Sequence, residues 1–168
     1  FIAGHATLGL EIFEDAPDTR AVIASVGGGG LLTGVGSALR FLRPEVRIWA
    51  AEPETAAPLA LSLERGSLQA FPGWKASFVD GAGGQSVFPR MWERMKPVID
   101  GSIVVSLEET RAAMRLLAEK SRVIAEGAGA LSVAAALTGK AGPGPIVAIV
   151  SGGNIDLAKF CELISLGG

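Results

Sequence analysis

The sequence is poor in the residues that crosslink chains and bind metals. It contains one cysteine, Cys161, and one histidine, His5, among 168 residues. A lone cysteine permits no internal disulfide and fits a reducing compartment, so we expect a cytoplasmic protein. A single histidine excludes a metal site built from several imidazoles. No apolar run approaches the ~18–20 residues that a membrane-spanning helix requires, so no membrane association is expected.

The sequence also lacks an excess of charge of one sign. The 15 Lys and Arg residues nearly balance the 17 Asp and Glu residues, so there is no basic stripe for a nucleic-acid backbone, and nucleic acid is disfavoured as a partner. With 49% hydrophobic residues the chain is too apolar to be disordered, and its length predicts a single domain over residues 1–168. It opens on Phe1 without the features of a signal peptide, so we interpret it as a piece of a longer polypeptide.

Patterns typical of strands and helices alternate along the chain. Short, almost wholly apolar runs are typical of parallel strands buried on both faces, and apolar residues at helical spacing predict helices between them. The predicted strands are 20–26, 46–51, 102–105 and 145–150, and the predicted helices are 6–15, 31–42, 53–65, 88–95, 107–120, 127–138 and 155–166. Ser106 and Glu109 form a capping box before the fifth helix. The alternation predicts an α/β fold with an open, largely parallel sheet and helices on both faces.

Glycine is abundant, at 23 of 168 residues, about twice the average usage. Four in succession, Gly27, Gly28, Gly29 and Gly30, join the first predicted strand to the second predicted helix. Such a turn lets successive N–H groups point at one anion, and the helix adds the positive end of its dipole. A tight turn needs only one or two glycines, so the pattern favours an anion cradle. It is neither a P-loop nor a strict GxGxxG motif.

Further candidate residues follow predicted strands or begin helices. Ser151 follows the last strand, where its hydroxyl can meet a ligand, and Asn154 can cap the last helix. Glu126 either complements a helix dipole or belongs to a site. Glu52 ends the second strand 22 residues after the last of the four glycines, which leaves a ribose-binding acid of a nicotinamide site open. Cys161 lies on an apolar helix face and is expected to be buried.

Taken in order, these motifs resemble those of one enzyme family. The segments are SVGGGGLLTGVG, AAEPE, DGAGG, EGAGALSVAAAL and VSGGNID, and the opening FIAGHATLGLEIF is similar to an AGQGT-type segment of the same family. Over essentially all of its length the chain resembles the C-terminal part of serine/threonine dehydratases, fold-type II enzymes dependent on pyridoxal 5′-phosphate. The resemblance implies the large domain of a longer two-domain enzyme that forms a homo-oligomer and acts on a small amino acid.

The resemblance also implies roles for individual residues. Residues 27–30 and the Leu31 amide would hold the cofactor's phosphate. The Ser151 hydroxyl would bond the pyridine nitrogen, and Glu126 and the backbone around Gly81 would be further contacts to the ring. A neutral hydroxyl partner leaves that nitrogen unprotonated, which favours loss of the substrate's β-hydroxyl. The implied reaction converts serine or threonine to a 2-oxo acid and ammonia.

Two features depart from the family pattern. The family's Schiff-base lysine lies upstream in a Ser-Phe-Lys-type motif that this chain lacks. We therefore expect no catalytic residue here and expect the missing N-terminal lobe to supply the lysine. Many relatives bind a divalent cation through the acid matching Glu52 and an aspartate six residues later, where this chain has Pro58, so no metal site is expected.

Other functions fit parts of the same pattern. A domain that holds phosphate ligands without chemistry needs only the glycines. A racemase of the same superfamily shares all of the motifs. A nicotinamide-binding oxidoreductase needs the first strand-helix-strand unit and Glu52, but four consecutive glycines and the distant Ser151 turn weigh against it. The choice among serine, threonine and larger hydroxy-amino acids depends mainly on the missing lobe.

Overall fold

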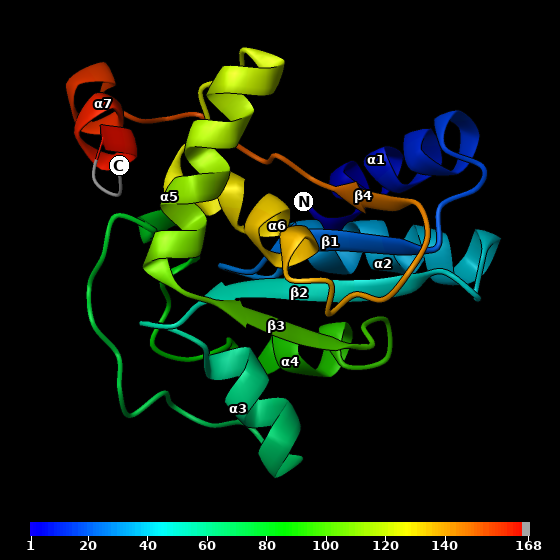
Figure 1. The fold of residues 1–168 in the computed structure, drawn as a ribbon. Helices are drawn as coiled ribbons and strands as arrows, with labels where there is room; N and C mark the ends of the chain where they lie inside the picture. The colour runs from blue at the N-terminus through cyan, green and yellow to red at the C-terminus, as the bar shows by residue number, and fades with distance from the viewer. Residues whose placement is uncertain (166–168) are drawn as a thin grey trace.

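A parallel sheet organises the computed structural model, which describes residues 1–165 (Figure 1). Its strands are β1 Ala21–Ser25, β2 Arg47–Pro53, β3 Gly101–Val105 and β4 Ile146–Ala148, in the spatial order β3-β2-β1-β4. All three pairings are parallel, and Ala21 of β1 lies opposite both Arg47 and Ile146. The α/β class with an open parallel sheet is confirmed.

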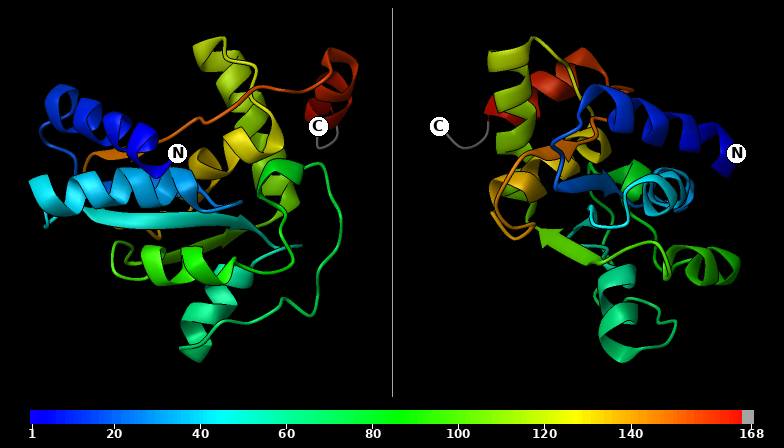
Figure 2. Two further views of the ribbon diagram at one scale, coloured as in Figure 1. Left: turned by 180° about the vertical axis from the view of Figure 1, so that it is seen from behind. Right: turned by 90° about the vertical axis from the view of Figure 1, so that its right-hand side faces the viewer.

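Helices cover both faces of the sheet, as the right-hand view of Figure 2 shows. One face carries α1 Ile2–Asp15, α2 Gly30–Leu42 and α4 Pro89–Met95, and the other carries α5 Leu107–Leu116 and α6 Gly127–Leu137. Helix α7 Leu157–Ser165 packs on α5 beyond the end of the sheet, and α3 Pro58–Arg65 lies beside β3. The side chains of β1 alternate between the two faces: Val22 and Ala24 pack in the hydrophobic core under α1, α2 and α4, and Ala21 and Ile23 pack in the core under α5 and α6. Burial on both faces explains why this strand is a continuous apolar run.

Local capping sets where two helices begin. The capping box of α5 is confirmed, because Ser106 Oγ accepts the Glu109 N–H at 3.1 Å and Glu109 Oε2 accepts the Ser106 N–H at 2.7 Å. The helix continues as a π-helical turn, η2 Leu117–Ser121. Helix α3 begins at Pro58 rather than at residue 53, with proline in its first turn. The strand β2 extends further than the predicted end at residue 51, to Pro53.

Two predictions about the last helix are wrong. Asn154 does not cap it, because α7 begins at Leu157 and its first bond runs from the Phe160 N–H to the Asp156 carbonyl at 2.8 Å, so that Asp156 precedes the helix. Cys161 is exposed rather than buried, since α7 packs through Phe160 and Leu163. The predicted end of this helix at residue 166 lies outside the described residues. No helix within residues 1–165 has the length and apolarity needed to cross a membrane.

Candidate functional site

The turns that contain the predicted site residues meet at the carboxyl edge of the sheet. Gly27, after β1, lies against the carbonyl oxygen of Gly81, which belongs to the 3-10 turn η1 Asp80–Ala82. A Cβ on Gly81 would come within 2.9 Å of the Ala128 side chain in α6, and one on Gly129 would overlap the Gly152 carbonyl after β4. The close contacts among these small residues bring four distant segments together. In open α/β sheets this edge is where ligands bind.

The glycine turn carries a row of free hydrogen-bond donors. No amide of residues 27–32 donates to another atom of the described chain, and the first to do so is that of Thr33, to the Gly29 carbonyl at 3.0 Å. Gly29, Gly30 and Leu32 are buried. Buried N–H groups without an acceptor are costly, and here they lie at the N-terminus of a 13-residue helix. The turn therefore fits a phosphate or another compact anion.

The fold within the chain explains two of the four glycines, Gly27 and Gly29. Gly27 is confined by the Gly81 backbone carbonyl, whereas a Cβ on Gly30 would meet only the ring of Phe1, an exposed side chain that can move aside. Gly29 has a φ of 81°, in the left-handed region that costs other residues about 1–2 kcal/mol. Gly27 and Gly29 therefore require glycine whether or not an anion binds.

Gly28 has the most free space of the four. It is exposed, its φ is not positive, and the nearest atom to a Cβ built on it is in the Phe88 ring at 3.9 Å. Nothing within the described chain prevents a side chain here. A glycine is required at this position only if a ligand approaches the backbone closely, so Gly28 supports the anion cradle most directly.

Ser151 has a neighbour that sequence reasoning missed. Its hydroxyl oxygen lies 3.2 Å from that of Ser25, the last residue of β1. The strands β1 and β4 are adjacent and parallel, so their carboxyl ends, and the two serines beyond the last paired residues, come together. Ser151 is exposed, whereas Ser25 is 9% exposed. The available signal was a lone hydroxyl at the end of an apolar strand, two residues before the first glycine of the turn.

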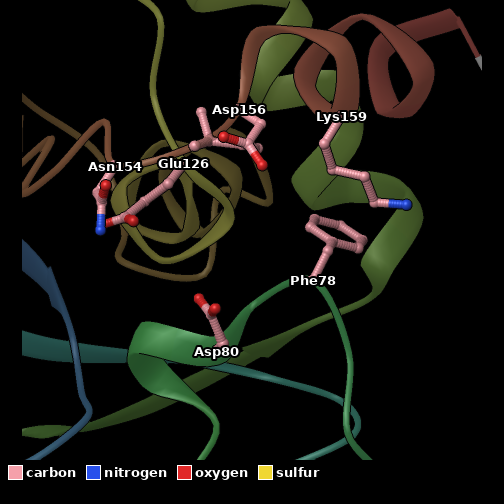
Figure 3. A pocket seen from close by; sticks show the side chains of 7 residues that line it. Phe78, Asp80, Glu126, Asn154, Asp156 and Lys159 are labelled. Atoms are coloured by element: carbon pink, nitrogen blue, oxygen red, sulfur yellow. The ribbon is translucent and has the colours of Figure 1, made fainter.

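Glu126 immediately precedes α6 and lines a cavity beside this edge. Its N–H donates to the Gly152 carbonyl at 3.1 Å, and its carboxylate lies against the Gly152 backbone. The cavity, of about 260 Å³, is lined by Phe78, Asp80, Glu126, Asn154, Ile155, Asp156 and Lys159 (Figure 3). Lys159, one of the chain's five lysines, pairs with Glu162 at 3.0 Å. The site thus has an open, polar flank where α6 and α7 begin.

Glu52 serves the fold instead of this site. Its carboxylate accepts the N–H groups of Leu59 and Ala60, both at 2.8 Å, and the Ser102 hydroxyl at 2.6 Å. The side chain is fully buried, and burial raises its pKa while these hydrogen bonds oppose the rise. Its oxygens are engaged within the chain, so Glu52 is not free for a ribose, and Pro58 is the first residue of α3.

The chain is similar in sequence and in fold to known proteins. A family described as pyridoxal-phosphate dependent enzyme matches residues 1–152. An L-threonine ammonia-lyase of Thermotoga maritima is 40% identical over 99% of this chain and 41% of its own length. A threonine deaminase isoform of Solanum lycopersicum superposes with a TM-score of 0.91 at 33% identity, covering 99% of this chain and 50% of its own. A serine racemase of maize gives 0.87 at 32% identity, covering 98% and 53%. The chain thus spans about half the length of these relatives.

Proposed function

Because the chain belongs to the family of pyridoxal-phosphate dependent enzymes, we propose that it is the part of a serine/threonine dehydratase that holds the cofactor's phosphate and ring nitrogen. The proposed enzyme converts threonine or serine to a 2-oxo acid and ammonia. One observation carries the proposal: the free amides of residues 27–32 and the Ser151 hydroxyl lie beyond the carboxyl ends of two adjacent strands. A ligand with an anion at one end and a hydrogen-bonding ring atom at the other matches this arrangement.

The residues divide the work of binding. Residues 27–30 and the Leu31 amide would hold the phosphate. The Ser151 hydroxyl would donate a hydrogen bond to the pyridine nitrogen and keep its proton. Glu126 and the backbone around Gly81 would lie along the ring edge. When bound, the cofactor supplies an electron sink for the substrate's Cα. A hydroxyl partner keeps the ring nitrogen neutral, which favours expulsion of the β-hydroxyl over transfer of a proton back to Cα.

The covalent anchor lies elsewhere in our proposal. Lys159 is the lysine that lines the cavity beside the site, and its ammonium is paired with Glu162. We therefore assign the Schiff-base lysine to an N-terminal lobe. That lobe and a second copy of the enzyme are the proposed protein partners. The single cysteine supports a cytoplasmic location.

The proposal is tested by mapping the reduced adduct. The intact polypeptide that contains this chain is incubated with pyridoxal phosphate, reduced with borohydride, digested and analysed by mass spectrometry. We expect one pyridoxyl group per polypeptide, on a lysine outside residues 1–168. An adduct on Lys159, or none at all, contradicts the assignment.

A racemase is the second candidate, favoured by the superposition with the maize serine racemase at a TM-score of 0.87. The products distinguish the two. A dehydratase releases equal amounts of 2-oxo acid and ammonia from the L-amino acid, whereas a racemase releases the D-amino acid. We expect the 2-oxo acid to dominate with both serine and threonine.

A further inference from the structure

We infer that Ser25 is a positioning residue that sets the direction in which the Ser151 hydroxyl donates. The inference rests on the proposed function, because it takes Ser151 as the partner of a pyridine nitrogen. The observation behind it is the 3.2 Å separation between the two hydroxyl oxygens. In the described part of the chain, Ser25 Oγ has no other hydrogen-bond partner.

The burial of Ser25 indicates that its hydroxyl has a purpose. It ends the strand AVIAS, in which every residue is buried, and Val26 after it is buried as well. A buried hydroxyl is costly unless it is hydrogen-bonded, and alanine would fill nearly the same volume. The partner that compensates this cost is an exposed serine at the ligand-facing edge of the sheet. The hydroxyl thus connects the core to the site.

Counting protons fixes the direction of the bond once a ligand is present. A hydroxyl has one proton to donate and two lone pairs with which to accept. If Ser151 uses its one proton in a hydrogen bond to an unprotonated ring nitrogen, it cannot also donate a hydrogen bond to Ser25. The bond between the serines must then run from Ser25 to Ser151. A hydroxyl that accepts one hydrogen bond is also a better donor of its own, because such chains polarise cooperatively.

The arrangement distinguishes two kinds of ligand. A ligand whose ring nitrogen needs a donor uses the whole chain from Ser25 through Ser151. A ligand with the same phosphate and a plain benzene ring uses only the glycine turn. Ser25 therefore contributes to binding of the first ligand and not of the second.

The test is a double-mutant cycle on the intact polypeptide, freed of cofactor. Ser25→Ala, Ser151→Ala and the double variant are titrated calorimetrically with pyridoxine 5′-phosphate, which has the ring nitrogen but no aldehyde, and with benzyl phosphate, which has neither. We expect Ser25→Ala alone to weaken pyridoxine phosphate binding about three- to tenfold, the range for one net hydrogen bond. Benzyl phosphate binding should not change, and Ser25→Ala should have no further effect in the Ser151→Ala background. Ser25→Thr keeps a hydroxyl and should restore binding.

The outcomes separate the inference from the proposed function. Three results would overturn the role of Ser25 and leave the proposed function standing. In the first, Ser25→Ala weakens binding equally with Ser151 present and with Ser151→Ala; in the second, it weakens binding of both ligands equally; in the third, it leaves the affinity for pyridoxine phosphate unchanged. An unmodified polypeptide that binds neither phosphate ligand overturns both. If Ser25→Ala does not fold, Ser25→Thr decides: affinity at the unmodified level supports the inference, and affinity lost for both ligands contradicts it.

Discussion

At the scale of single residues, the glycine turn contains positions that the fold itself restricts and one, Gly28, that only a bound ligand would restrict. Gly29→Asp is a poor test of phosphate binding, because Gly29 has a φ of 81° and a Cβ there would come within 2.7 Å of the Met95 sulfur. Loss of binding in that variant would follow from misfolding alone. Gly28 has neither restriction, so a substitution there tests the proposed ligand contact without disturbing the fold.

We predict that Gly28→Asp weakens binding of pyridoxal phosphate at least tenfold, which corresponds to about 1.4 kcal/mol. The new carboxylate occupies the space of the phosphate and repels its charge. The midpoint of urea unfolding should stay nearly unchanged, because a Cβ at this position has no neighbour closer than 3.9 Å. Binding is measured by fluorescence titration of the cofactor-free polypeptide.

Gly73→Asp is the matched control for this prediction. Gly73 is exposed, lies in the loop before η1, and would bring a Cβ no closer than 3.5 Å to the Phe71 ring. It introduces the same charge at a distance from the glycine turn, so cofactor affinity should be retained. If Gly28→Asp binds the cofactor as tightly as Gly73→Asp does, residues 27–30 are not the phosphate cradle.

At the scale of elements, Glu52 joins β2, β3 and the start of α3 through one carboxylate. Burial raises its pKa above the ordinary value of 4.5, and its three hydrogen bonds only partly offset this effect. The folded state therefore binds a proton at Glu52 more tightly than the unfolded state does. The resulting stabilisation is fully present below pH 4.5 and is lost as the pH rises through the raised pKa.

Comparison with Glu52→Gln isolates this dependence. The amide of the variant does not titrate. The free energy of unfolding of the natural protein should therefore exceed that of Glu52→Gln by more near pH 5 than at pH 8. The substitution should still cost about 1–3 kcal/mol near pH 5, because a buried hydrogen-bond network is disturbed. Urea unfolding at both pH values measures it, with Glu64→Gln on the exposed part of α3 as control. A difference that grows with pH contradicts the direction of the pKa shift.

At the scale of the whole molecule, local patterns predict the layers and non-local contacts decide the site. The continuous apolar run of β1 indicates a strand covered on both faces, and Ser106 with Glu109 marks the start of α5, because each signal lies within a few residues. The roles of Glu52 and Ser25 depend on contacts with Ser102 and Ser151, across 50 and 126 residues. No periodicity records such pairings, so the bond between the two serines was not predicted. Cys161 was misplaced for the same reason, since its exposure depends on how α7 lies on α5.

The open edge of the sheet leads to the last prediction. In the described residues β4 pairs only with β1, and its three residues are half-buried, in contrast to the fully buried β1. Edge strands of this kind recruit further strands. We expect residues 1–168, expressed alone, to self-associate with increasing concentration in sedimentation velocity experiments, and we expect the N-terminal lobe to cover this edge in the intact enzyme.

A proline on β4 tests whether backbone pairing drives the association. The Ile149 N–H donates inward to the Ile23 carbonyl at 3.0 Å, so by strand alternation the Ala148 N–H points to the open side. Ala148→Pro removes that outward donor at a place where edge strands tolerate proline, and it should shift the chain toward monomer. Leu137→Lys, which replaces an exposed leucine at the end of α6, should not. If only Leu137→Lys dissolves the assemblies, apolar side chains rather than the strand edge hold them together.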